Sequence, residues 1–350
     1  MASSTHNQHQ LLPNLYTGAT TSAPPPTPAT NPNNLLSTPD AADALSRLFH
    51  RLPPNLSLPS RRSPSSSSTC PPSLSLSSPN DTLSCVSQLG YAQLTDHSVP
   101  SELANSAESE SLALFDLSQD QKHSLFPKTW PLGYDDDDDE LAESFRFEPS
   151  CSTELPLASL REFARALEKL GLKIVNDLTN ALGVENQNRL CSVVWVSECL
   201  PGNKTGGFYP FIIGLQYQIR SQKYSLLSDS GWVSVLPHVD SILVTVGDIA
   251  QVWSNGKLKK VRGRPVATVG EENESRCITM SLLITLPAES NVAPLLPKAS
   301  KDQKEEDDEE ENSVGGEERV FHSFDFENYA WRVYHERLLF KDPLDRYRLP

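Results

Sequence analysis

The sequence predicts an α+β fold in which a jelly roll, a double-stranded β-helix of two packed sheets, is flanked by helices. Two observations carry this prediction. Apolar residues recur with the helical period up to about residue 185, and beyond it they alternate as in strands. The alternating part holds seven or eight short segments rich in Val, Ile and aromatic residues, separated by turn residues, which is typical of double-sheet folds.

Residues 1–72 are predicted to be largely disordered. Residues 1–80 hold 14 of the 28 prolines, and runs of proline and serine do not support a packed element. The exception is a short helix at 40–52, where apolar residues recur at helical intervals and Pro53 provides the stop. We expect this helix to dock on the later domain or, alternatively, to bind a partner.

Residues 73–185 are predicted to form a mainly helical region. The last helix carries a continuous apolar stripe, and Gly183 is its natural C-cap. The stretch 127–155 is rich in proline and acids and is predicted to be a long surface loop. The expected helices and strands span 74–76, 81–89, 90–95, 100–117 and 156–182.

Residues 186–297 are predicted to form the jelly-roll core. An acidic disordered loop at 298–318 and a C-terminal helix within 319–350 follow it. The core strands are expected at 190–196, 211–219, 224–227, 232–236, 241–246, 249–253, 264–269 and 277–286.

Composition excludes several classes of function. The formal net charge is -15. Most of it comes from six acids at 135–140 and from ten acids against two lysines at 301–318. Contacts with phosphate need clustered Lys and Arg, and the chain has no such cluster. The composition therefore argues against a nucleic-acid partner. No apolar run approaches the roughly 20 residues that a membrane span needs.

Cysteine spacing and the N-terminus bear on the compartment. The six cysteines have neither metal-binding nor disulfide-scaffold spacing, which favours a protein of the cytoplasm and/or nucleus. A chloroplast is less favoured, because no Lys or Arg occurs before Arg47.

Three segments resemble a known family. Leu89–Leu103 (LGYAQLTDHSVPSEL) resembles the GFFQLVNHGVP segment of the plant 2-oxoglutarate/Fe(II)-dependent dioxygenases, such as gibberellin oxidase and ACC oxidase. Gly231–Gly256 is similar to that family's GKWVDVPPVPGAFVVNIGDQLQILSNG, and Phe324–Arg348 to its C-terminal FTWEEYLKLRYKTRLLGKDALDYFR. The resemblance covers about residues 80–348 and implies the same jelly roll.

The resemblance also implies a place for cofactors. Active members hold Fe(II) with a His-x-Asp pair and a distal His, which leaves open positions for O2 and substrate. In register with the family, the pair falls on Phe208-Tyr209-Pro210 and the distal His falls on Gly263. Because Phe, Pro and Gly offer no side-chain ligand, we expect a degenerate iron site, no catalytic residue and no bound cofactor.

The family also holds 2-oxoglutarate with an Arg-x-Ser pair, since a guanidinium binds a carboxylate with two hydrogen bonds. Arg276 lies near the position of that arginine and is the candidate cosubstrate-binding residue, although Ile278 replaces the serine. Arg264 is a second candidate cation. The family's tyrosine-containing NYYPPCP segment corresponds here to a segment that includes Trp195.

A separate His-x-Asp occurs at His238-Val239-Asp240. In register it replaces a turn of the family that is not at the iron, so we expect a surface turn. If it did bind metal, the distal ligand would have to be His322 or His335.

Three functions remain open. The first is a catalytically inactive dioxygenase-like protein that binds a small molecule or regulates a partner, with a hydrophobic metabolite in the mouth of the barrel. The second is an active oxidoreductase that hydroxylates or desaturates a small plant metabolite, with Fe(II) and 2-oxoglutarate as cofactors and His238 and Asp240 as displaced ligands. The third is an interaction scaffold that binds protein partners through its acidic loops and Pro-rich tail.

Overall fold

The computed structural model describes ten stretches of the chain, and structural statements concern these alone. They span 68–75, 86–136, 143–150, 155–184, 188–199, 208–229, 231–265, 277–295, 320–336 and 342–349. The predicted helix at 40–52, the acidic loop at 298–318 and Arg276 lie outside them.

Within the described stretches, two sheets form the core. The larger has the strand order β1-β2-β9-β6-β11-β5-β4-β3, and the smaller has the order β10-β7-β8. The strands are β1 Ser73–Leu74, β2 Tyr91–Leu94, β3 Gly133–Asp135, β4 Ser144–Phe147, β5 Cys191–Cys199, β6 Ile213–Tyr217, β7 Tyr224–Ser228, β8 Gly231–Val235, β9 Ile242–Val246, β10 Val261–Pro265 and β11 Cys277–Thr285.

The helices lie before, between and after these strands. A short strand pair joins β12 to β13 near the C-terminus. The elements are α3 Ser101–Phe115, α4 Gln119–Leu125, α5 Ala158–Ala181, α6 Asp248–Trp253, β12 Asn291–Val292, β13 Phe324–Asp325, α7 Phe326–Glu336 and the 3-10 helix η1 Pro343–Tyr347. In the described stretches no helix is long and apolar enough to cross a membrane.

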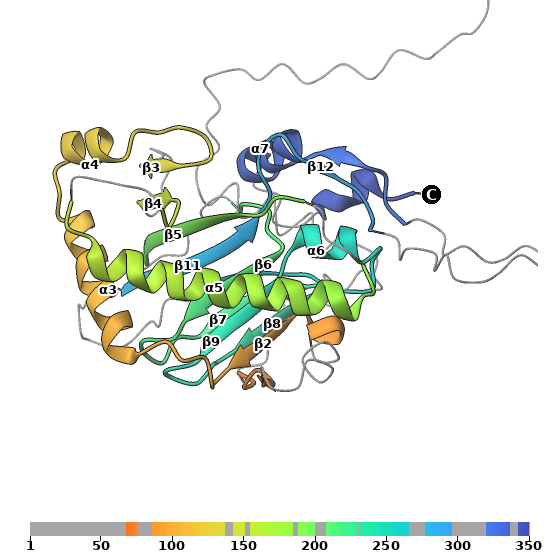
Figure 1. The fold of residues 1–350 in the computed structure, drawn as a ribbon, viewed down its shortest axis with the longest axis horizontal. Helices are drawn as coiled ribbons and strands as arrows, with labels where there is room; N and C mark the ends of the chain where they lie inside the picture. The colour runs from red at the N-terminus through yellow and green to blue at the C-terminus, as the bar shows by residue number, and fades with distance from the viewer. Residues whose placement is uncertain are drawn as a thin grey trace, which may run out of the picture. The chain divides into compact units, whose positions relative to one another are not determined.

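Helices α3 and α5 contact one face of the large sheet, and α5 runs along it (Figure 1). The apolar stripe of α5 is buried, as its helical spacing predicts. Gly171 permits the close approach, because a Cβ atom there would lie 2.8 Å from Cγ1 of Ile284 on β11. The helix ends as expected, with Gly183 in the left-handed region at φ 70°.

The opposite face of the large sheet points toward the small sheet. Side chains of both sheets pack into one apolar cluster: Tyr91, Tyr224, Leu226, Val235, Leu243 and Val261. From Leu243 a row of directly paired positions crosses this inward face. It runs through Gln216, Ser281, Trp195 and Arg146. The inward face is therefore apolar at β9 and becomes polar and aromatic toward β4.

Two sequence expectations are wrong. The stretch 127–155 is not a continuous surface loop, because β3 and β4 pair within it and extend the large sheet. Aromatic side chains of this hairpin pack in the core, and they outweigh the acidic character of the stretch. Residues 249–253 form part of α6 and not a strand. All six residues of α6 are buried, so the apolar run gave no periodicity.

Candidate functional site

The segment Phe208-Tyr209-Pro210, predicted to stand at the His-x-Asp position, packs with aromatic residues. Tyr209 is buried, and its ring lies 5.9 Å from that of Trp130 and 6.0 Å from that of Phe326 between centroids. The carbonyl of Pro210 accepts a 2.9 Å hydrogen bond from Oγ1 of Thr285. Phe208 packs against the main core. Phe208 and Pro210, which stand where the His and Asp are predicted, have no side-chain atom that could bind a metal.

Gly263, predicted to stand at the distal His position, lies directly opposite Leu226 in the pairing of β10 with β7. A Cβ atom at residue 263 would lie 2.4 Å from Cδ2 of Leu226. Leu226 is fully buried in the cluster between the sheets. Any side chain at residue 263 therefore requires Leu226 to move.

His238 and Asp240 form the surface turn that their register predicts. Both are exposed. Nε2 of His238 lies 3.4 Å from Sγ of Cys70, and Oδ1 of Asp240 accepts a 3.2 Å hydrogen bond from Tyr217. His97 donates a 2.8 Å hydrogen bond to the Asp240 carbonyl, which gives that histidine a structural role. In the part of the chain that is described, no three His, Cys, Asp or Glu residues are grouped so that they could hold a metal.

The structure does not place the side chains of the two arginines that were predicted as candidates to bind 2-oxoglutarate. Arg276 lies outside the described residues, and only the backbone of Arg264 is described. Two inward positions of β11 are Ser281, which pairs with Gln216, and Thr279, which pairs with Ser197. Thr279 lines a pocket at the end of β6. The lining mixes polar residues such as Gln216, Gln218, Arg220 and Glu108 with apolar ones such as Ile278 and Met280. There Arg220 forms a 2.6 Å ion pair with Glu108.

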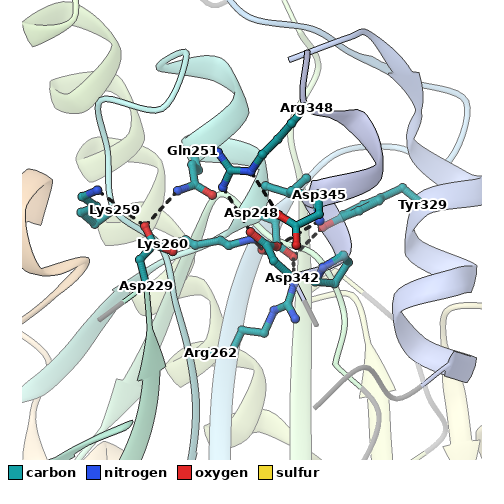
Figure 2. A network of polar contacts seen from close by, with 12 residues as sticks. Asp229, Asp248, Gln251, Lys259, Lys260, Arg262, Tyr329, Asp342, Asp345 and Arg348 are labelled. Carbon is teal, nitrogen blue, oxygen red and sulfur yellow. Dashed lines mark hydrogen bonds and ion pairs between the residues drawn. The ribbon is translucent and has the colours of Figure 1, made fainter. Parts of the chain in front are cut away.

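A buried ion network lies next to Gly263 (Figure 2). Nη2 of Arg262 lies 3.1 Å and 3.0 Å from the two carboxylate oxygens of Asp248, and Nζ of Lys260 lies 3.0 Å from the same group. The hydroxyl of Tyr329 donates a 2.9 Å hydrogen bond to Asp248, and Lys260 also pairs with Asp342. The network joins β10 and α6 to α7 and to the segment that opens η1.

Electrostatics within this network favour the charged carboxylate. Burial alone would raise the pKa of Asp248, but the charges of Arg262 and Lys260 and the hydrogen bonds from Lys260 and Tyr329 outweigh it and hold that pKa well below its usual range. Asp248 is therefore a permanent counter-ion. Its contacts are satisfied within the protein, which favours a structural role.

A second buried charge, which the sequence analysis did not predict, lies at the polar end of the inward face. Arg146 on β4 is 2% exposed, and its Nη2 donates a 2.7 Å hydrogen bond to Oδ2 of Asp135 on β3. Asp135 also accepts hydrogen bonds from Lys128, at 2.7 Å, and from the hydroxyl of Tyr334 on α7. Burial would raise the pKa of Asp135, but these three donors hold it below its usual range.

Aromatic rings surround the Arg146 guanidinium. Its central carbon lies 4.8 Å from the ring centroid of Tyr334, 5.3 Å from that of Trp195 and 6.0 Å from that of Trp130. Each distance is within the range of a cation–π interaction. Because Trp130 also contacts Tyr209, this cluster is continuous with the segment predicted for the iron ligands. Alternation in Ser144–Phe147 was the one sequence signal that could have located Arg146.

Comparison with known proteins gives one consistent family. Residues 208–283 match the sequence model of the 2OG-Fe(II) oxygenase superfamily. The chain is 26% identical over 273 residues to 1-aminocyclopropane-1-carboxylate oxidase of Persea americana, which covers 69% of this chain and 80% of that relative. It is 22% identical over 296 residues to gibberellin 2-beta-dioxygenase 1 of Arabidopsis thaliana, which covers 71% and 83% of the two chains.

A solved structure supports the architecture. The rice dioxygenase for auxin oxidation aligns with a TM-score of 0.58 and 19% identity, over 77% of this chain and 94% of that one. At this identity the likeness concerns the fold alone. It confirms the predicted fold class, a double-stranded β-helix flanked by helices.

Proposed function

The chain belongs to the 2OG-Fe(II) oxygenase superfamily, and from this premise we propose that it is a non-catalytic member, which binds a small molecule or regulates a partner. Members of the superfamily use iron(II) and 2-oxoglutarate, as its name states. The question is therefore whether the residues present in this chain suit those groups.

One observation carries the proposal. The position in register with the distal iron-binding His is Gly263, and the space beside its Cα is occupied by the buried side chain of Leu226, 2.4 Å from where a Cβ atom would stand. Gly263 is exposed, and a histidine here would require the end of the Leu226 side chain to shift, which carries a cost of overpacking in a filled cluster. Glycine itself offers no side-chain ligand for a metal.

The count of histidines supports the same conclusion. A facial triad of this family needs two histidines and one carboxylate. The segment that matches the superfamily, 208–283, contains one histidine, His238, and the chain has no other histidine between His123 and His322. His238 is exposed on a turn whose backbone is bonded to Gln93. The residues present in this segment do not fit an iron(II) triad.

Anaerobic calorimetry of the full chain tests the proposal. Mn(II), or Fe(II) under nitrogen, is titrated with and without 2-oxoglutarate, and the His238→Ala variant serves as a matched control. The proposal predicts no metal binding above background in either protein. Stoichiometric binding that 2-oxoglutarate tightens and His238→Ala abolishes would overturn it, and would favour the alternative of an active oxidoreductase acting on a small plant metabolite.

A further inference from the structure

We propose that Arg146 is the anion-binding end of a ligand site that takes the carboxylate of a small, planar aromatic acid. The inference rests on the proposed small-molecule-binding function and names the class of ligand. It has three supports: unused hydrogen-bond donors on Arg146, the positive charge of the group that carries those donors, and a continuous set of aromatic rings that leads to the surface.

The first support is the hydrogen bonding of Arg146. A guanidinium has five N–H donors. The Nη2 atom donates to Asp135, whereas the buried Nε and Nη1 atoms have no hydrogen-bond partner among the described residues. Charged donors that are buried without partners are costly to a folded protein, so such a group needs a separate explanation. An acceptor supplied by a ligand is one.

The second support is the positive charge of Arg146. Asp135 is the carboxylate that Arg146 contacts, and it is shared with Lys128 and with the hydroxyl of Tyr334. Lys128 is 55% exposed, so solvent screens its charge, and Arg146 and Asp135 form the buried ion pair. The donors of Arg146 that have no partner among the described residues still belong to a charged group. A charged donor binds an anionic acceptor such as a carboxylate more strongly than a neutral one.

The third support is the set of aromatic rings. The Trp130 ring lies 4.9 Å from that of Tyr334 and 5.4 Å from that of His335. His335 in turn stacks on Trp331 with 4.3 Å between centroids, and Trp331 is 54% exposed. The rings therefore run without a break from the surface of α7 to the guanidinium. Flat apolar walls select a planar ligand, because such rings stack favourably on one another.

In the proposed site, Trp130 controls access to the Arg146 guanidinium. It is half-buried, whereas Arg146 beneath it is almost fully buried. It contacts Tyr209, Tyr334 and the guanidinium at once. The proposal therefore requires the Trp130 ring to turn aside before a ligand can reach the guanidinium.

The test uses the metal-free full chain and two matched probes, 2-naphthoate and the uncharged 2-naphthamide. Calorimetry is expected to show that the acid binds about tenfold or more tightly than the amide, the difference typical of one charge-assisted hydrogen bond. The Arg146→Gln variant should lose this preference. The Arg165→Gln variant, which removes an exposed arginine of α5, should keep it.

Two further measurements keep the inference open to refutation if Arg146→Gln does not fold. The ratio of the affinities for 2-naphthoate and 2-naphthamide is measured on the wild-type protein and needs no variant. Trp331→Ala changes only an exposed ring and should weaken 2-naphthoate binding. Equal affinities for acid and amide, or no binding of either probe, would contradict the site. Hexanoate binding as tightly as 2-naphthoate would contradict the aromatic selectivity.

The result of the naphthoate test can be distinguished from the result of the metal-binding test of the proposed function. Metal binding with 2-oxoglutarate would refute the non-catalytic proposal whatever the naphthoate result. Absence of metal binding together with equal binding of acid and amide would leave that proposal standing and refute the Arg146 site.

Discussion

Gly263 and Leu226 face each other across β10 and β7, and a Cβ atom on the glycine would lie 2.4 Å from Cδ2 of the leucine. Leucine thus occupies part of the volume that a side chain would need at residue 263, the position predicted for the distal ligand. The residue at 263 and its partner at 226 consequently form one packing unit, and their energetics should be coupled.

Gly263→His should lower the free energy of unfolding by about 1–3 kcal/mol, because the imidazole must displace Leu226 from a filled cluster. A double-mutant cycle with Leu226→Ala, measured by urea unfolding, should show that the two changes together cost less than their sum. Strict additivity, or a Gly263→His variant as stable as the wild type, would show that residue 263 has room for a ligand.

Removal of the Asp248 charge should destabilise the fold strongly. Asp248→Asn leaves Arg262 and Lys260 with less compensation in a buried environment, and we expect a loss of about 3–5 kcal/mol in urea unfolding. Asp345→Asn is the matched control. The Asp345 side chain is 65% exposed, so its pair with Arg348 should contribute under about 1 kcal/mol.

The same carboxylate predicts a dependence of stability on pH. The pKa of Asp248 is well below its usual range in the folded protein, so the stabilisation is present above the unfolded-state pKa of about 3.9 and is lost as pH falls through the folded value. Unfolding free energy should therefore fall below about pH 4. In Asp248→Asn the fall should be shallower, and an unchanged slope would exclude Asp248 as its source.

Two of the three partners of Asp135, Tyr334 and Lys128, should contribute unequally to stability. Tyr334→Phe removes a donor to a carboxylate that is 4% exposed, and should cost about 1.5–3 kcal/mol in thermal or urea unfolding. Lys128→Gln removes a cation that is 55% exposed, and should cost under about 1 kcal/mol. The reverse order would mean that the ion pair with Lys128, and not the buried cluster, stabilises this end of the sheet.

The sequence predicted the long elements well because their patterns are long. The 24 residues of α5 carry several turns of an apolar stripe, and β11 is a run of nine residues, most of them apolar. The six-residue α6 was mistaken for a strand, since every residue in it is buried and no face is distinguished. A short run of buried residues does not contain the information that distinguishes a helix from a strand.

The site was predictable only in part for a similar reason. Register alone placed Gly263 at the distal-ligand position, but the pairing of β10 with β7 that brings Leu226 against it is a tertiary fact. Asp135 opens an acidic run, which suggests a solvated loop. Its burial depends on Arg146 and on Tyr334, which is 199 residues away in the sequence. Long-range pairs of this kind leave no local pattern.

Absence of an iron site is tested most directly by an electron paramagnetic resonance titration of Mn(II) into the full chain in the presence of excess 2-oxoglutarate. Free Mn(II) gives a sharp signal that is lost on binding. We expect the signal of added Mn(II) to stay at its protein-free intensity, in the wild type and in His238→Ala alike. Loss of one equivalent of signal in the wild type would contradict it, and would establish a metal site that the side chains at 208, 210 and 263 do not provide.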